Sequence, residues 1–445
     1  MHAIGLLLVA ALIAAPLVEF LPLAAQHTPS AVFSQYIGCA ALIAMAIAQI
    51  VATRIWIIEP IFGGLDRVYV LHKWLGIGAL LAVLVHDTVD AEIDGVGRET
   101  WLTDLAETLG EISLYGFLIL VLITIVTFIP YHLWRWSHKL MGAFFALSAF
   151  HFAFIMKPFA NTDPVGMYVL GICGIGIVAY IYALLPDTFA KASNSYTVEN
   201  IENTGDSLAV NLKPVGRGIR HHAGQFAFLT FDLPHLKEVH PFTVSAKPDG
   251  DRNLQFTIKP LGDYTAKLQE HLKPSVAAKV SSAFGHFRLR RSSKSQVWIA
   301  SGIGITPFKA WLEEVTPDHG KIDLFYCYRG ANSAPHLEYI EELVGKLDKL
   351  TLHAIDSLTG PRLSASKIKE SVGDSLSGTQ IFFCGPEVMR ETLLRDLKAL
   401  GISNRQFHFE EFEIRSGIGV RKFLSFVIKR FSSKNLSPDL LARSG

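Results

Sequence analysis

Cysteine, charge and repetition are all scarce in this chain of 445 residues. Its four cysteines stand far apart and form no Cys-x-x-Cys pair, which argues against a structural zinc site, an iron–sulfur cluster and a disulfide framework. Charged residues make up only 18% and the formal net charge is +1, so the composition does not indicate a nucleic-acid partner. No internal repeat or long low-complexity tract is visible in the sequence.

Hydrophobic residues, in contrast, make up 50% of the chain, and the mean hydropathy of +0.32 is too high for a soluble protein of this size. The apolar excess lies before residue 190. Six runs there are long and apolar enough to cross a bilayer, at about residues 3–25, 33–52, 68–88, 111–130, 138–157 and 165–185. We therefore expect a six-helix transmembrane bundle over residues 1–190. The first run also resembles a signal peptide, but it lacks a basic segment before it, which favours a retained helix.

The charges of the loops predict the orientation of this bundle. Arg54, Arg67, Arg135, Lys139 and Lys191 would lie on one side, which the positive-inside rule makes cytoplasmic. The opposite loop, residues 86–111, is acidic and is expected outside the membrane. It is either a solvated face or a docking surface for a cationic or metal-bearing acceptor.

Two of the apolar runs carry a pair of histidines each: His72 and His86 in one, His138 and His151 in the other. Ionisable residues inside a membrane are costly and usually mark function. Each pair spans about 20 Å along a helix, so that each helix offers one histidine near each membrane face. Since both runs cross in the same direction, His72 would face His138 and His86 would face His151. Imidazole is a good axial ligand of haem iron, which predicts two stacked bis-histidine haems.

The helical phase of these histidines is imperfect. In a regular α-helix, His86 would point about 40° away from the direction of His72, a difference that helix tilt can absorb. His151 would point about 140° away from the direction of His138, which tilt alone does not explain. We expect a π-bulge to restore the phase of the second helix. The glycines Gly76, Gly78 and Gly142 would let either a macrocycle or another helix approach closely. The alternative interpretation is that all four are interfacial or core histidines, but the matched arrangement in two helices favours haem.

After residue 190 the pattern changes to short alternating runs, which predict β-strands up to about residue 292. These fit a small antiparallel β-barrel over residues 191–292. A strand, a Gly-rich turn and a helix follow at residues 297–315, and strands then alternate with helices, which predicts a parallel α/β domain over residues 293–415. Residues 416–445 form a basic tail that is either an amphipathic helix on the inner membrane surface or a helix packed on the soluble part.

Four segments occur in a characteristic order: HPFTV at 240–244, KPLGDYT at 259–265, GIGITPF at 302–308 and FCGP at 383–386. Together they resemble the ferredoxin–NADP reductase superfamily. With the four membrane histidines, the chain up to about residue 415 resembles the ferric reductase and NADPH oxidase family, particularly its bacterial NADPH oxidase homologues. The resemblance implies an antiparallel β-barrel FAD domain and an α/β NAD(P)-binding domain after the membrane bundle.

The resemblance also implies roles for residues in the flavin domain. Phe242 would lie against the isoalloxazine ring and Thr243 would hydrogen-bond near its N5 atom. His240, beside Pro241, would contact the ribityl or phosphate part. The FAD pyrophosphate would be bound by residues of the second segment, namely Lys259, Gly262 and Thr265.

In the nucleotide domain, the resemblance implies that the NAD(P)H pyrophosphate lies in the Gly-rich turn, against Gly302, Gly304, Thr306 and Pro307. The nicotinamide would be bordered by Cys384, Gly385 and Pro386. Arg329 ends the next strand, where it would grip an adenosine 2′-phosphate, and this favours NADPH over NADH. Phe412 matches the near-terminal aromatic that covers the flavin, although the tail after it makes such gating less free. Thr243, Cys384 and Phe412 are thus the expected catalytic residues.

The expected function is that of a transmembrane oxidoreductase in a bacterial inner membrane, with its FAD and NADPH domains in the cytoplasm. Electrons would pass from NADPH through FAD and two b-type haems to an acceptor outside the bilayer. The expected acceptor is dioxygen, giving superoxide; ferric chelate and a periplasmic protein partner are the alternatives. A membrane anchor with a sensory flavin domain is a further alternative, against which the second histidine pair argues.

Overall fold

The computed structural model describes residues 2–55, 57–93, 96–97, 99–125, 129, 131–185, 193–234, 236–290, 292, 294–373, 376 and 378–410. These residues fall into two compact units. The first contains the helices up to Leu185, and the second contains both β-sheets. Phe412 and the basic tail lie outside the described residues, so the predictions made for them remain untested.

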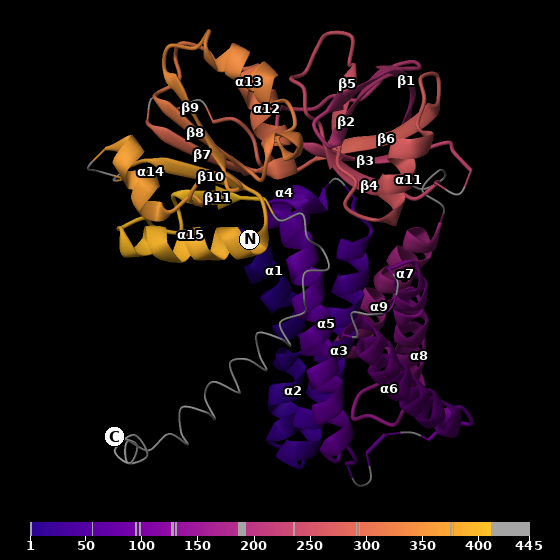
Figure 1. The fold of residues 1–445 in the computed structure, drawn as a ribbon. Coiled ribbons are helices and arrows are strands. Elements are labelled where there is room, and N and C mark those ends of the chain that lie inside the picture. Colours follow the sequence, from indigo (N-terminus) through magenta and orange to yellow (C-terminus); the bar gives the residue numbers. More distant parts are fainter. Residues whose placement is uncertain are drawn as a thin grey trace, which may run out of the picture. The chain divides into compact units, whose positions relative to one another are not determined.

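Every secondary-structure element that the structure describes in the first unit is a helix (Figure 1). Its helices are α1 (Ala3–Ala14), α2 (Leu17–Ala24), α3 (Pro29–Ala52), α4 (Ile58–Phe62), α5 (Leu65–Thr88), α6 (Thr103–Ile125), α7 (Tyr131–His138), α8 (Met141–Phe154) and α9 (Pro164–Leu184). Within the described ranges, five helical segments are long and apolar enough to cross a membrane: Ala3–Ala24, Pro29–Ala52, Arg67–Thr88, Thr103–Ile125 and Pro164–Leu184. The fifth expected run corresponds to α8, which has only 14 residues, so the count of six spans remains a prediction.

Small residues allow these helices to pack closely. A Cβ on Gly142 of α8 would collide with the ring of Tyr180 on α9, and a Cβ on Gly116 of α6 would collide with the ring of Phe144 on α8. Gly142 therefore serves helix packing, which decides between its two expected roles. A Cβ on Gly76 or Gly78 would meet nothing within 4 Å.

The second unit begins with a six-stranded antiparallel sheet in the order β4-β3-β6-β1-β2-β5. Its strands are β1 (Ser193–Thr204), β2 (Ser207–Pro214), β3 (Phe226–Phe231), β4 (His240–Thr243), β5 (Leu254–Ile258) and β6 (Ala277–Phe284), with helix α11 (Asp263–His271) before β6. An isolated bridge between Val244 and Phe256 joins the chain just after β4 to β5, the two edge strands. Closure into a full barrel remains a prediction.

A five-stranded parallel sheet follows, in the order β11-β10-β7-β8-β9. Its strands are β7 (Gln296–Ser301), β8 (Ile322–Tyr328), β9 (Leu350–Asp356), β10 (Gln380–Cys384) and β11 (Phe407–Phe409). The connecting helices are η1 (Gly302–Ile305), α12 (Thr306–Leu312), η2 (Ala331–Ser333), α13 (Leu337–Val344), α14 (Ala365–Val372) and α15 (Glu387–Ala399) (Figure 1). Side chains of β7 alternate between two apolar clusters, with Trp298 in one and Ile299 in the other. Both faces of the sheet are therefore buried, as a parallel sheet requires.

Candidate functional site

The helical unit brings the four histidines together as two facing pairs. The ring centroids of His72 and His138 lie 6.0 Å apart, and those of His86 and His151 lie 6.5 Å apart. A metal ion that bonds each facing imidazole nitrogen at about 2 Å would separate two ring centroids by roughly 6 Å. Each pair therefore has the spacing of two axial ligands on one metal ion, and a porphyrin would supply the remaining ligands itself.

Backbone carbonyls orient three of the four imidazole rings. The Nδ1 atom of His72 lies 3.0 Å from the carbonyl oxygen of Ala48, and that of His86 lies 2.9 Å from the carbonyl oxygen of Ser34. The Nδ1 atom of His151 likewise lies 2.9 Å from the carbonyl oxygen of Ala106. Donation from Nδ1 fixes the tautomer in which Nε2 is free to bind a metal, and such a carbonyl is a usual partner of metal-binding histidines. These carbonyls carry no side-chain signal, and sequence reasoning missed them.

Glycines make room for two of these rings. A Cβ on Gly38, one helical turn after Ser34, would lie 3.2 Å from the imidazole of His86. A Cβ on Gly110, one turn after Ala106, would lie 2.6 Å from Nδ1 of His151. The imidazoles of the outer pair thus reach their carbonyls because no side chain stands in the way.

His138 is held differently from the other three. Its Nδ1 atom is buried and has no hydrogen-bond partner among the described residues. Its ring stacks on Trp134 instead, with centroids 5.2 Å apart and an interplanar angle of 29°. The indole Nε1 of Trp134 in turn donates to the hydroxyl oxygen of Thr124, at 3.2 Å.

The expected π-bulge between His138 and His151 is wrong. Helix α7 ends at His138 and α8 begins at Met141. In the intervening turn, the amides of Lys139 and Leu140 donate to carbonyls only three residues back, at 3.2 and 3.0 Å. Such a turn is wound more tightly than an α-helix. The directions of His138 and His151 are therefore adjusted by a tighter turn and not by the wider turn of a π-bulge.

In the second unit, two of the sequence segments meet at the edge of the antiparallel sheet. The ring of His240 on β4 stacks on that of Tyr264 on α11, with centroids 4.0 Å apart. The hydroxyl of Tyr264 is buried and has no partner among the residues described here, and burial raises the pKa of this phenol. A buried hydroxyl without a partner is costly, which suits a position that a polar ligand completes. Pro241, Phe242 and Thr243 lie on the same strand, which pairs with β3.

The residues expected at the FAD pyrophosphate already have partners in the protein. The ammonium of Lys259 lies 2.7 Å from a carboxylate oxygen of Asp206. The hydroxyl oxygen of Thr265 accepts hydrogen bonds from the amides of Leu261 and Gly262 at 3.0 and 3.1 Å. Thr265 therefore shapes the turn at Gly262, and its contact with a phosphate remains a prediction.

The nucleotide turn and the end of β10 lie directly against each other. A Cβ on Gly304 would collide with the carbonyl of Cys384, and a Cβ on Gly385 would lie 2.8 Å from the Cβ of Ser301. Gly302 has φ +52°, a left-handed conformation that glycine adopts at low cost. Thr306 and Pro307 occupy the first turn of α12, whose amino end follows this loop, as a phosphate site requires.

The remaining nucleotide residues differ in exposure. The Cys384 thiol is buried, and this burial raises its pKa; its place beside the nicotinamide remains a prediction. Pro386 is the residue directly before the first residue of α15. Arg329 is exposed at the end of β8.

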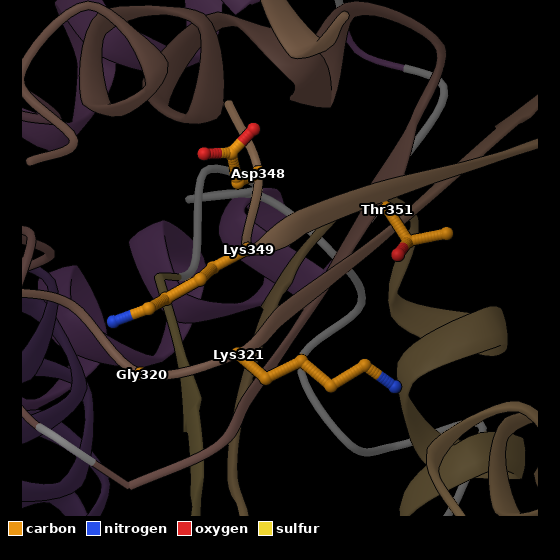
Figure 2. Close-up of a pocket in the computed structure, with 5 residues that line it drawn as sticks. All are labelled: Gly320, Lys321, Asp348, Lys349 and Thr351. Atoms are coloured by element: carbon orange, nitrogen blue, oxygen red, sulfur yellow. The ribbon is translucent and has the colours of Figure 1, made fainter. Parts of the chain in front are cut away.

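A pocket of about 400 Å³ lies at the other end of the parallel sheet, lined by Gly320, Lys321, Asp348, Lys349 and Thr351 (Figure 2). Strands β8 and β9 begin beside it, whereas ligands of open α/β sheets bind at the carboxyl ends of strands. The side chains of Lys321 and Lys349 point away from each other, and Nζ of Lys349 already donates to the carbonyl of Pro317 at 2.7 Å. This pocket is therefore not the nucleotide site.

Comparison with known families assigns a domain to three segments of the chain. Residues 37–149 match the ferric reductase like transmembrane component. Residues 191–297 match an FAD-binding domain, and residues 298–394 match an oxidoreductase NAD-binding domain.

Among curated proteins, the carnitine monooxygenase reductase subunit of Escherichia coli (strain K12) is 31% identical over 154 residues, which are 34% of this chain and 46% of the relative. The beta subunit of the heme-dependent oxidative N-demethylase of Ectopseudomonas mendocina (strain ymp) is 30% identical over 33% of this chain and 44% of the relative. Ferric reduction oxidase 7, chloroplastic, of Arabidopsis thaliana is 26% identical over 58% of this chain and 36% of its own length. The chain thus spans less than half the length of each of these relatives. With a ferric reductase like transmembrane component, an FAD-binding domain and an oxidoreductase NAD-binding domain in this order, the chain has the domains of a membrane-bound oxidoreductase that uses a flavin and a nicotinamide nucleotide.

Proposed function

We propose that the chain carries electrons across a bacterial inner membrane, from cytoplasmic NADPH through FAD and two bis-histidine b-type haems to an acceptor outside. His72 and His138 would hold the inner haem, and His86 and His151 the outer one. Bound FAD would supply the conversion of a hydride into single electrons, and bound haem would supply one-electron transfer.

The arrangement of the histidine pairs carries this proposal. Each pair has the ring spacing of two axial ligands, and three of the four rings present a free Nε2 because Nδ1 faces a carbonyl. Histidines that only filled a core would not need to face each other twice along the same two segments. If the four histidines only filled the core, no function would offset the cost of placing ionisable side chains in a membrane.

The residues of the second unit support roles in nucleotide and flavin binding. The protein aligns the bound nucleotide through the amides of the turn at Gly302–Ile305 and the amino end of α12. Phe242 and Thr243 lie on an edge strand, and His240 and Tyr264 extend this surface. NADPH is favoured by Arg329, and NADH is the alternative.

Dioxygen, giving superoxide, is the proposed acceptor. A ferric chelate is the second candidate, because a relative is named as a ferric reduction oxidase. Delivery to a periplasmic protein is the third, since other relatives are reductase subunits of monooxygenases.

Stopped-flow visible spectroscopy of the detergent-purified chain tests the acceptor. The protein is reduced anaerobically with NADPH and then mixed with air-saturated buffer or with ferric citrate. Fast reoxidation by air with release of superoxide would support the oxidase. Faster reoxidation by ferric citrate would identify a ferric reductase, and slow reaction with both would point to a protein acceptor.

A further inference from the structure

A buried ion pair lies on helix α12, behind the nucleotide turn. Nζ of Lys309 is 2.7 Å from Oε1 of Glu313, and only 6% and 13% of the two side chains are exposed. The hydroxyl of Tyr339 on α13 donates to the same carboxylate oxygen at 3.0 Å, and its ring lies 4.9 Å from the ammonium. The pair is thus enclosed by the nucleotide domain on one side.

On its other side, this ion pair is bonded to the flavin domain. Nζ of Lys309 donates to the carbonyl of Ser245 at 3.0 Å. The amide of Lys247 donates to Oε2 of Glu313 at 2.9 Å. Both charged groups therefore contact the segment 245–247, which follows strand β4 of the antiparallel sheet and lies outside their own domain.

The two ends of this connection are close in sequence to the two expected cofactor sites. Strand β4, which is expected at the flavin, ends at Thr243, and Ser245 lies two residues further along the chain. Lys309 lies one helical turn inside α12, whose first residues are Thr306 and Pro307. One ion pair thus links the strand that would face the flavin to the helix that would hold the NADPH pyrophosphate.

A second chain of hydrogen bonds reaches the same point. Nε2 of His336 lies 2.8 Å from the hydroxyl of Thr257, and this hydroxyl donates to Oγ of Ser245 at 3.0 Å. Ser245 is fully buried. It is therefore linked to two elements of the nucleotide domain: directly to Lys309 of α12, and through Thr257 to His336 at the amino end of α13.

We propose that Lys309 and Glu313 are positioning residues for hydride transfer: they hold the nucleotide turn at a fixed place relative to the flavin strand. This inference rests on the proposed use of FAD and NADPH. An ion pair made of buried charges is seldom the most stabilising choice for such a place, because apolar residues of similar volume do as well or better. The ion pair instead holds the two domains in a fixed geometry. This matters because a displacement of about 1 Å between reactants slows a reaction by up to about 100-fold.

The test replaces both charges at once, since removing only one would leave the other buried and unpaired. The double variant Lys309→Met, Glu313→Leu keeps apolar packing but removes both bonds to residues 245–247. In stopped flow, with the full-length purified chain, we expect the rate of flavin reduction at saturating NADPH to fall about 10- to 100-fold. The FAD content and the NADPH concentration at half-saturation should change less than about threefold, because the binding residues are untouched.

The matched control is the pair Glu342 and Lys346, which has the same spacing and the same 2.7 Å distance but is exposed. Its double variant Glu342→Gln, Lys346→Met should reduce flavin at the wild-type rate. The single variant Lys309→Arg, which keeps the charge and a donor for Ser245, should recover most of the lost rate.

Two results would overturn the proposal. One is a rate in the Lys309→Met, Glu313→Leu variant equal to that of the control. The other is a loss of rate that only parallels a loss of bound FAD, which would give the pair a purely structural role. If NADPH did not reduce the flavin of the wild-type chain, the proposed function itself would be contradicted. The wild-type measurement comes first and therefore separates this outcome from the two above.

Discussion

Gly304 and the carbonyl of Cys384 are in direct contact, so that the nucleotide turn touches the end of β10 with no room for a side chain. Cys384 pairs with Ala300 of β7 in the parallel sheet, and the turn follows β7 directly. This contact sets the position of the turn at the carboxyl edge of the sheet, where a nucleotide binds in open α/β folds.

The first prediction concerns this contact. Gly304→Ala should lower the rate of flavin reduction by NADPH at least about tenfold, because the added methyl must push the turn away from β10. FAD should stay bound, and both quantities can be read from the flavin absorbance. The control is Gly345→Ala, where a Cβ would meet its nearest atom at 3.5 Å, an ordinary contact. Equal rates in the two variants would refute this role of Gly304.

The second prediction concerns the outer histidine pair. Gly110→Ala places a methyl 2.6 Å from the unmutated position of Nδ1 of His151, so the ring must turn away from the carbonyl of Ala106. The outer haem should be lost or become high-spin, which electron paramagnetic resonance and haem content would detect. Gly171→Ala is the matched control, since a Cβ there meets nothing within 4 Å. Two normal low-spin signals in Gly110→Ala would count against His151 as a ligand.

The third prediction concerns the inner pair, where stacking replaces a hydrogen bond. Trp134→Leu removes the ring that lies against His138, so His138 should lose its fixed orientation. We expect a changed low-spin signal and a shifted midpoint potential of the inner haem only, measured by redox titration. A shift in the outer haem alone would mean that the two sites are assigned to the wrong histidines.

The fourth prediction concerns pH and His336. Burial, with the nearby charge of Lys309, lowers the pKa of His336 to about 4, whereas an unfolded chain has a histidine pKa of about 6.5. Between these values the unfolded state binds more protons, so stability is present above pH of about 6.5 and is lost as the pH falls toward about 4.

His336→Gln should remove part of this pH dependence, because glutamine can still donate to Thr257 but does not titrate. Melting followed by flavin fluorescence should show a smaller drop between pH 6.5 and 4.5 in this variant, by roughly 3 °C. Other buried histidines titrate in both proteins, so only the difference between the curves is informative. Parallel curves would show that His336 does not contribute.

The fifth prediction concerns the choice of nucleotide. Arg329→Ser should raise the KM for NADPH about 10- to 100-fold and leave the KM for NADH nearly unchanged, because only NADPH carries the phosphate that a guanidinium would bind. Steady-state kinetics with both nucleotides measures this. An equal effect on both would mean that Arg329 does not read the 2′-phosphate.

The sequence predicted the elements whose residues carry their own signal. Four histidines in apolar runs indicated the facing pairs, and the order of HPFT, GDYT, GIGITP and FCGP indicated the two domains of the second unit. The order of elements also separated the two sheets, because short alternating runs predicted the antiparallel sheet and strands alternating with helices predicted the parallel one.

What the sequence did not reveal depends on groups without a side-chain signature. The carbonyls of Ser34, Ala48 and Ala106 orient three histidines, yet any residue has a carbonyl. The tight turn at Lys139 and Leu140 replaces the expected π-bulge, because phase arithmetic shows that a helix must deviate but not in which direction. The bonds of Lys309 to the flavin domain join residues 64 positions apart, and no local pattern predicts such a contact.

The most direct test of the central claim is an anaerobic titration of the purified full-length chain with NADPH, followed by visible spectroscopy. The account predicts two b-type haems per chain, both reduced by NADPH, and a His72→Leu variant whose flavin is reduced while the remaining haem is not. A chain that purifies without haem, or a His72→Leu variant whose haem is reduced at the wild-type rate, would contradict it.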